Sequence, residues 1–368
     1  MGNWKNGELG DFVTLKRGFD LPQQKREDGQ VPIFSSSGIT GTHSTAMVKA
    51  PGVITGRCGT IGEVFYAAED FWPLNTTLFV EDFHGNDAKF IYYFLKTLEW
   101  SKFTSASAVP GINRNTVHKE IVSLPDIETQ KRIASTLSML DEKIKTNVEI
   151  NDNLYEMVNA YYTSLFKDVE CEMTTIGNYA ERIYSGGTPT TSNAAYWGGA
   201  FGWFSSGETR NRFVISTEKS ITQTGIDNSS TKLAAKHDIV MASAGQGFTR
   251  GQTSMLLIDT YVNQSVIVIH ADRKILPYLF WNLANRYEEL RAISDSSSIR
   301  GSLTTKMIAA FEVPLANNDV IQTFSDFAWA VIPQIENNLL ENERLAALRD
   351  LLLPKLMSGE IDVSAVQL

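Results

Sequence analysis

Two long segments of the chain carry the same helical pattern, and this pattern constrains the fold more than any other feature. Between residues 130 and 166, apolar side chains fill the first and fourth positions of successive heptads, interrupted only at Asn147 and Asn151. The pattern returns 191 residues later, where Asn338 and Asn342 take the same seam positions. Each segment predicts a helix of about forty residues, which is roughly 60 Å long.

These asparagines predict how the two helices pair. If the helices run antiparallel, the two asparagines of one face the two of the other, and their amides satisfy one another inside an otherwise apolar seam. A slipped register would bury amides against leucines at a cost of roughly a few kcal/mol each. The alternative is that the asparagines face solvent at a local bend, since Pro333 implies a kink in the second helix. We expect the paired arrangement, which fixes the register.

The segments that precede each helix also resemble one another, in the same order. "VPIFSSSG" from residue 31 corresponds to "FGWFSSG" from residue 201, and "PGVITGRCGTIG" from residue 51 corresponds to "HDIVMASAGQG" from residue 237. The serine-rich stretches predict a shared structural corner in front of loops that differ, "ITGTHS" and "ETRNRF". We therefore predict a mixed α/β fold of the α+β type with an internal twofold repeat. Globular domains at 1–125 and 169–314 would be separated by a long antiparallel two-helix coiled coil, formed by spacer helices within 126–168 and 315–368.

Length and charge limit the function classes. A chain of 368 residues is long enough for two domains, each with its own core. With 33 Lys and Arg against 42 Asp and Glu, the formal net charge is −9, so any nucleic-acid role needs local basic loops or a partner that supplies phosphate contacts. No apolar run approaches a membrane span and the first residues lack a secretory pattern. We expect a cytoplasmic protein in which Cys58 and Cys171 are reduced.

The sequence contains no evident catalytic or metal site. The glycine-rich turns at 56–62 and 243–251 have neither a Gly-Lys-Ser/Thr phosphate motif nor a dinucleotide fingerprint that opens a helix. The five histidines lack metal-ligand spacing, and the serines show no sign of a partner base. There is also no Asn-Pro-Pro-Tyr or Asp-Pro-Pro-Tyr tetrapeptide to hold a flipped base. We predict a non-catalytic chain with no cofactor and no metal.

Polar loops that carry isolated cations and amides can contact DNA bases directly. Arg and Lys bind guanine, Asn and Gln bind adenine, and Ser or Thr bind phosphates or base edges. Any one of these side chains is more simply a solvated surface group, but as a set in matching segments they predict DNA contacts. In the first domain the candidates are Lys16, Arg17, Lys25, Arg26, Ser36, His43, Arg57, Thr60, Lys102 and Arg114. In the second domain they are Arg182, Ser206, Arg210, Arg212, Lys232, His237, Arg250 and Arg300.

Together these features resemble the specificity (S) subunit of type I restriction-modification systems, over essentially the whole chain. The phrases that carry the resemblance are "SLPDIETQKRIASTLSMLDEKI" at 123–144 and "LRDLLLPKLMSGEI" at 348–361. The resemblance implies that each globular domain is a target-recognition domain that reads one half of a split site in double-stranded DNA. It also implies that the helices act as a ruler and as the docking surface for two modification (methyltransferase) subunits. Restriction (helicase-nuclease) subunits would join the complex in a prokaryotic cytoplasm, and the S subunit itself would perform no reaction.

Two other functions stay open on the residues alone. The domains could bind proteins as a non-catalytic scaffold, although their loops are polar where a protein-binding face would cluster exposed aromatics. The glycine-rich turns could bind a nucleotide, which the missing phosphate motif disfavours.

Overall fold

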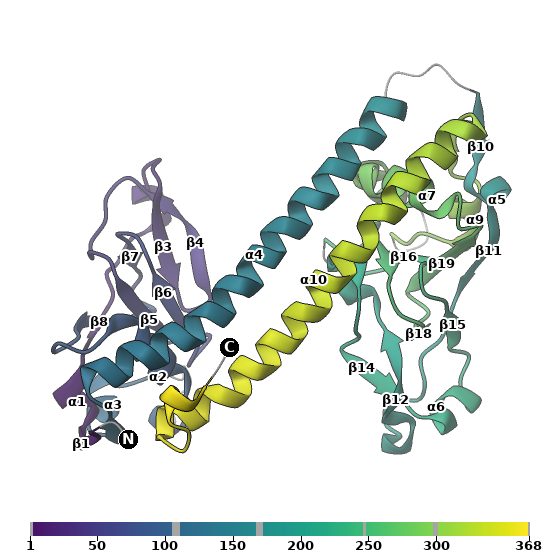
Figure 1. Ribbon diagram of the computed structural model, residues 1–368. Coiled ribbons are helices and arrows are strands. Elements are labelled where there is room, and N and C mark those ends of the chain that lie inside the picture. Colours follow the sequence, from purple (N-terminus) through teal and green to yellow (C-terminus); the bar gives the residue numbers. More distant parts are fainter. Residues whose placement is uncertain (1–2, 105–110, 167–171, 246–247, 297–300, 367–368) are drawn as a thin grey trace. The chain divides into compact units, whose positions relative to one another are not determined.

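The computed structural model describes residues 3–104, 111–166, 172–245, 248–296 and 301–366, which form a mixture of helix and sheet (Figure 1). In this described part of the chain, no helix is both long enough and apolar enough to cross a membrane.

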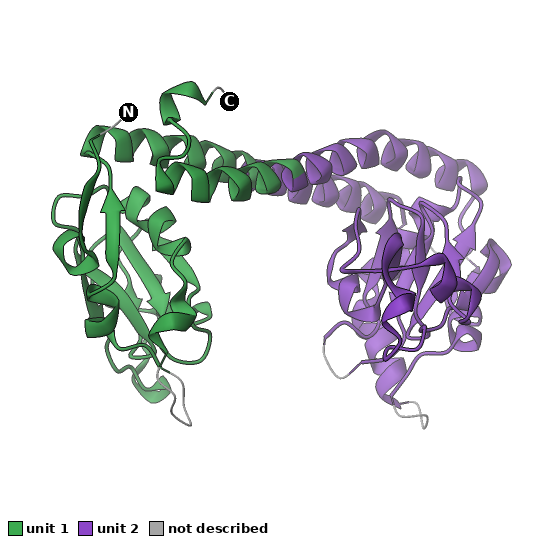
Figure 2. Cartoon of the chain, turned by 90° about the horizontal axis from the view of Figure 1, so that it is seen from below, with its two compact units in different colours: residues 1–144, 344–368 green, residues 145–343 purple. Residues whose placement is uncertain are grey.

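Two compact units make up the chain, and each is described by itself. Unit 1 comprises Met1–Ile144 and Arg344–Leu368, and unit 2 comprises Lys145–Glu343 (Figure 2). The two long helices are α4 (Ile127–Phe166) and α10 (Asn318–Ser358). Each helix contributes one part to unit 1 and the other part to unit 2.

Unit 1 contains two small sheets. Their strand orders are β2-β8-β5-β6 and β4-β3-β7, and a separate antiparallel pair joins β1 to β9. The strands are β1 (Lys5–Glu8), β2 (Thr14–Arg17), β3 (Val31–Ser35), β4 (Gly38–His43), β5 (Gly52–Gly56), β6 (Val64–Ala67), β7 (Trp72–Pro73), β8 (Thr77–Asp82) and β9 (Ile121–Leu124). The shorter helices are α1 (Leu9–Phe12), α2 (Ala88–Lys96) and α3 (Arg114–His118), with 3₁₀ turns η1 (Gln23–Lys25), η2 (Trp100–Phe103) and η5 (Val363–Ala365).

The core of unit 1 takes side chains from the sheet, from α2 and from both long helices. The Asp87 side chain caps the start of α2 by accepting the N–H of Phe90 at 2.8 Å, and α2 then packs on β5 and β6. Leu137 of α4 and Leu356 of α10 are fully buried in the same cluster as Leu15 of β2. These parts of the long helices therefore belong to the core of unit 1.

Unit 2 also contains two sheets and a separate strand pair. The strand orders are β11-β19-β16-β17-β13 and β14-β12-β18-β15, and β10 pairs with β20. The strands are β10 (Met173–Thr175), β11 (Ala180–Ser185), β12 (Trp197–Phe204), β13 (Phe213–Val214), β14 (Lys219–Ile221), β15 (Lys232–Ala234), β16 (Ile239–Ala242), β17 (Thr253–Leu256), β18 (Thr260–Val262), β19 (Val266–Ala271) and β20 (Glu312–Pro314). The helices are α5 (Ile176–Tyr179), α6 (Gln223–Asp227), α7 (Leu276–Asn285), α8 (Tyr287–Ser296) and α9 (Thr305–Ala309), with 3₁₀ turns η3 (Ala194–Tyr196) and η4 (Ser206–Arg210).

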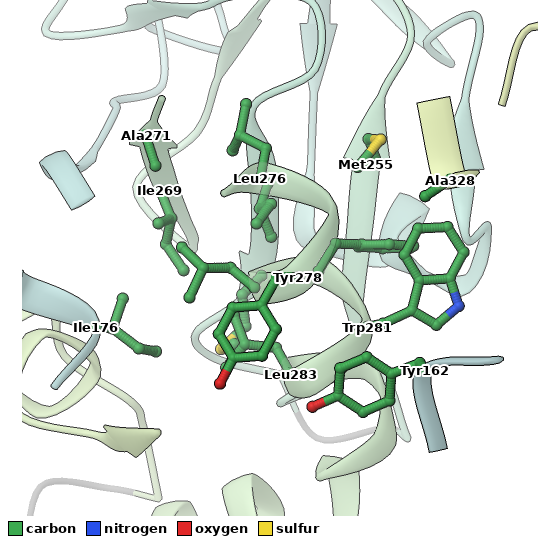
Figure 3. Close-up of a cluster of buried hydrophobic side chains, with 14 of the residues drawn as sticks. Tyr162, Ile176, Met255, Ile269, Ala271, Leu276, Tyr278, Trp281, Leu283 and Ala328 are labelled. Carbon is green, nitrogen blue, oxygen red and sulfur yellow. The ribbon is translucent and has the colours of Figure 1, made fainter. Parts of the chain in front are cut away.

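Helix α7 lies at the centre of the unit 2 core (Figure 3). Trp281 of α7 is fully buried and lies in one cluster with Tyr162 of α4 and Ala328 of α10. Two polar side chains of α7 are bonded within this core: Asn282 Nδ2 donates to the Tyr162 hydroxyl at 2.9 Å, and the Tyr278 hydroxyl donates to the carbonyl of Pro314 at 2.7 Å. As in unit 1, both long helices contribute to the core of the unit.

Within unit 2, the asparagines of α4 and α10 bond to one another. Asn147 Nδ2 donates to Asn342 Oδ1 at 2.9 Å. Asn338 Nδ2 donates to Asn151 Oδ1 at 2.8 Å. The residue numbers rise along α4 from Asn147 to Asn151 while those of their partners on α10 fall from Asn342 to Asn338, so these helix segments run antiparallel. The side chains of Asn147 and Asn338 are 1% and 6% exposed, so the alternative in which these residues face solvent is wrong. Helix α10 continues through Pro333 without a break.

A parallel strand pair lies at a matching place in each unit. In unit 1, β3 runs parallel to β7 and pairs Phe34 with Pro73. In unit 2, β12 runs parallel to β18 and pairs Phe204 with Val262. These phenylalanines are the aromatic residues of the two serine-rich stretches. Beyond them the paths diverge, because β3 turns back into β4 whereas β12 leads into the 3₁₀ turn η4.

The residue that follows β5 and the residue that follows β16 are held by matching backbone hydrogen bonds. In unit 1, the N–H of Arg57 donates to Thr76 O at 2.8 Å, and its carbonyl accepts the N–H of Ile112 at 2.9 Å. The bonds in unit 2 are Ser243 N–H to Ser265 O at 2.8 Å and Leu303 N–H to Ser243 O at 2.8 Å. The same backbone arrangement therefore presents arginine in one unit and serine in the other.

Candidate nucleic-acid interface

A hollow on unit 1 brings together four of the cations expected to contact DNA. Its volume is about 880 Å³, and its lining includes Lys16, Arg17, Arg57 and Arg114. The first two end strand β2, Arg57 follows β5, and Arg114 opens α3. The fold thus gathers charges from three separate segments at one concave surface, an arrangement that suits a polyanion.

Arg57 is held at both its backbone and its side chain. Its Nε donates to the carbonyl of Asn75 at 3.3 Å, and the amide of Asn75 in turn donates to the carboxylate of Asp20. The residue is half-buried, and its backbone N–H and carbonyl are both engaged as described above. These contacts fix the base of the guanidinium and leave its two Nη groups as the remaining donors.

The other three cations are less constrained. Lys16 forms an ion pair with Glu81 of β8, in which both side chains are more than 40% exposed. Arg17 and Arg114 are exposed. Exposed cations of this kind suit contacts with phosphate groups, which carry no sequence information.

Ser36 and Thr60 pack against the turn that carries Arg57. A Cβ on Gly59 would lie 3.2 Å from Ser36 Oγ, and a Cβ on Gly56 would collide with the carbonyl of Thr60. Gly59 also has a φ of 83°, which disfavours other residues. The turn therefore places these two hydroxyl residues near Arg57.

His118 links two of the segments that line this hollow. Its Nε2 accepts the N–H of Leu15 at 2.9 Å, which ties α3 to β2. A ring that accepts through Nε2 is neutral and carries its proton on Nδ1. Burial lowers the pKa of His118, and the positive charges of Arg114 and His84 lower it further.

A smaller hollow in unit 2 surrounds Tyr184. Its volume is about 500 Å³, and its lining includes Arg182 of β11 together with Lys232 and Leu233 of β15. The Tyr184 hydroxyl donates to the carbonyl of Leu233 at 2.7 Å, and the charged groups of Arg182 and Lys232 lie 5.8 and 5.7 Å from the ring centroid. Burial raises the pKa of Tyr184 to about 12, so the ring stays neutral beside the two cations.

Two of the residues expected to contact DNA instead bond to other groups of the protein. His43 is only 6% exposed, and its Nδ1 accepts the N–H of Glu27 at 3.0 Å. Arg250 donates through Nη1 to the carbonyl of Gly301 at 2.5 Å and pairs through Nη2 with Asp295. Because burial and internal partners occupy these two side chains, we leave both out of the proposed interface.

The remaining candidates among the described residues lie outside both hollows. Three have partners within unit 2: Arg210 pairs with Glu218, Arg212 lies over the ring of Tyr155, and His237 contacts the ring of Trp329 edge-on. The others are Lys25 and Arg26 at η1, Lys102 in an ion pair with Glu99, and Ser206 at the start of η4. Arg300 lies outside the described residues. Across the described ranges, no group of three or more His, Cys, Asp or Glu side chains could hold a metal ion.

Comparison with known proteins identifies the family. The model of the type I restriction modification DNA specificity domain matches residues 1–156 and 169–343, which together are most of the chain. The chain belongs to this family. The match favours DNA specificity over the protein-binding scaffold.

Two characterised members of the specificity family resemble the chain along much of its length. The type I restriction enzyme HindI specificity subunit of Haemophilus influenzae is 21% identical over 347 residues, covering 72% of this chain and 75% of the relative. The EcoR124I/EcoR124II specificity subunit of Escherichia coli is 26% identical over 242 residues, covering 62% and 59%. The crystal structure of a type I restriction-modification S subunit from M. genitalium matches with a TM-score of 0.66 and 17% identity, over 97% of this chain and 96% of that one. The last likeness shows that the fold is shared.

Two residues that line these hollows were not among the DNA-contact candidates predicted from the sequence. Asn113 lines the hollow of unit 1 and caps α3, with its Oδ1 accepting the N–H of Asn115 at 3.0 Å. Its position directly before the candidate Arg114 could have indicated that Asn113 belongs to the same surface. Tyr184 lines the hollow of unit 2, and its position two residues after Arg182 on a strand puts both on the same face.

Proposed function

We propose that the chain is the DNA-recognition subunit of a type I restriction-modification complex and that it reads a bipartite target. Residues 1–125 and 169–314 would be its two target-recognition domains, related by a twofold repeat, each reading one half-site of duplex DNA. The segments 126–168 and 315–368, which contain α4 and α10, would pair as an antiparallel coiled coil. Their fixed register would then select one spacing between the half-sites.

One observation carries this proposal. Two units, each containing a stretch matched by the DNA specificity family, hold corresponding backbone positions with the same hydrogen bonds but present different side chains there, Arg57 in one and Ser243 in the other. Base specificity comes from side-chain donors and acceptors, whereas the backbone arrangement only positions them. A duplicated arrangement with exchanged side chains is what two readers of different sequences require.

We further propose that the chain performs no reaction itself and takes no cofactor. Methyl transfer and base flipping would belong to two modification subunits, and translocation and cleavage to restriction subunits. The names of the relatives, specificity subunits of type I restriction enzymes, support this division of labour. Partner subunits would also supply phosphate contacts, which a chain with a net charge of −9 provides only locally.

Methylome sequencing tests the proposal. A host that expresses this chain with its methyltransferase subunits should carry adenine methylation at one split motif, and that motif should vanish when this chain alone is deleted. A methylome that stays unchanged while the partner genes are expressed would contradict the proposal. A protein-binding scaffold predicts that unchanged result.

A further inference from the structure

Each cation that lines the hollow of unit 1 has an uncharged counterpart at the matching place in unit 2. The matching places are the last two residues of β2 and β11, the residue after β5 and β16, and the first residue of α3 and α9. The pairs are Lys16 with Tyr184, Arg17 with Ser185, Arg57 with Ser243, and Arg114 with Thr305. Ammonium and guanidinium groups in unit 1 are thus replaced by hydroxyl groups in unit 2.

Among these four cations, Arg57 alone has the constraints that base readout requires. Its backbone N–H and carbonyl are bonded to Thr76 and Ile112, and its Nε is bonded to the carbonyl of Asn75. A guanidinium fixed through Nε presents Nη1 and Nη2 end-on as a pair of parallel donors. Arg17 and Arg114 are exposed and, among the described residues, have no hydrogen-bond or ion-pair partner that would orient them.

The paired Nη1 and Nη2 donors of Arg57 determine which base this residue can bind. Two parallel N–H donors match the O6 and N7 acceptors of guanine in the major groove, which is the commonest specific contact of arginine with DNA. Ser243 cannot make such a contact, because its side chain has one hydroxyl and the residue is only 6% exposed. The matching position of unit 2 therefore lacks a reader of guanine.

We infer that Arg57 reads a guanine in the half-site bound by unit 1, whereas Arg17 and Arg114 contact phosphates. This inference rests on the proposed function. It makes the two half-sites chemically unequal: one requires guanine at the position facing Arg57, and the other has no such requirement at the matching position.

Substitution at Arg57, with a matched control, tests this inference. The full chain in complex with its methyltransferase subunits is offered duplexes in which each position of the bipartite motif is randomised, and the bound fraction is sequenced. The variants Arg57→Ser and Arg17→Ser both install the residue that unit 2 carries, and Arg57→Lys keeps the charge but removes the fork. Circular dichroism melting of each variant checks that the fold is retained, and Arg57→Lys provides the test if Arg57→Ser does not fold.

The expected results differ between the two positions. Both Arg57 variants should lose about ten- to hundred-fold discrimination for guanine at one position of one half-site and leave the other half unchanged. Arg17→Ser should weaken binding to all sequences alike and reduce the salt slope of log K by about 0.9. Retained guanine preference in the Arg57 variants, or loss of preference in both half-sites, would overturn the inference. A wild-type complex that prefers no split motif would instead overturn the proposed function.

Discussion

Asn338 on α10 donates a hydrogen bond from Nδ2 to Oδ1 of Asn151 on α4, at 2.8 Å, inside a seam that is otherwise largely apolar. Both partners are side-chain amides, and the bond gives the oxygen of the accepting amide a donor from the other helix. The Asn147–Asn342 bond at 2.9 Å lies one helical turn further along the seam and does the same. A shift of either helix would break both bonds at once, which is how polar seam residues specify register.

Replacing both members of this pair should destabilise unit 2 by less than the sum of the two single replacements. Asn338→Leu removes the donor to Oδ1 of Asn151 and should lower the free energy of unfolding by about 1–3 kcal/mol. The double variant Asn151→Leu with Asn338→Leu removes both polar groups, so its loss should be smaller than the sum of the two single losses. Urea unfolding of the two single variants and the double variant measures this coupling. Strictly additive losses would mean that the two amides do not depend on each other.

The stability of unit 1 should fall on mild acidification because of His118. Its pKa is lowered in the folded chain by burial and by nearby positive charge, so folding disfavours the protonated ring. The stabilisation is therefore complete above the unfolded-state pKa of about 6.5 and is lost as pH falls from there through the folded-state pKa. Protonation would also place a proton on Nε2, which accepts the N–H of Leu15.

His118→Gln keeps an acceptor for the Leu15 N–H but cannot titrate. Melting temperatures measured between pH 8 and pH 5 should drop less for this variant than for the wild type. Equal drops in the two proteins would show that His118 is not responsible for the acid sensitivity.

Gly18 and Gly186 should be intolerant of alanine for the same reason in the two units. A Cβ on Gly18 would collide with the carbonyl of Leu74, and a Cβ on Gly186 would collide with the carbonyl of Val262. Each alanine variant should lose about 1–3 kcal/mol of stability, since backbone must move to make room. A Cβ on Gly207 would lie 4.0 Å from the Ser205 hydroxyl, too far to collide with it, so Gly207→Ala is the control.

Hydrogen exchange can assign each of these losses to a unit. Gly18→Ala should reduce amide protection in unit 1, Gly186→Ala should reduce it in unit 2, and Gly207→Ala should change neither. Wild-type protection in either of the first two variants would contradict the close packing at these glycines.

The sequence could predict a long helix, because its apolar pattern repeats over many residues. It could not predict the partners of individual cations. The heptad seam predicted from residue 130 to residue 166 lies within α4, because apolar side chains that repeat at heptad spacing over so many turns indicate a long helix. The family prediction, drawn partly from the phrase at 348–361, is confirmed by the family match. Arg57 and Arg250 stand in similar glycine-rich turns, yet Arg250 bonds to Gly301 and Asp295, which are remote in sequence. Only the tertiary structure distinguishes a cation that lines a hollow from one that braces a loop.

Exchange of one recognition domain tests the central claim, that the two units read separate half-sites. Residues 1–125 are replaced by the corresponding residues of a family member with a different target, and the methylated motif is determined by sequencing the genome of a host that carries the methyltransferase subunits. The account predicts a new sequence in one half of the motif, with the other half and the spacing between them unchanged. Changes in both halves, or in neither, would contradict it.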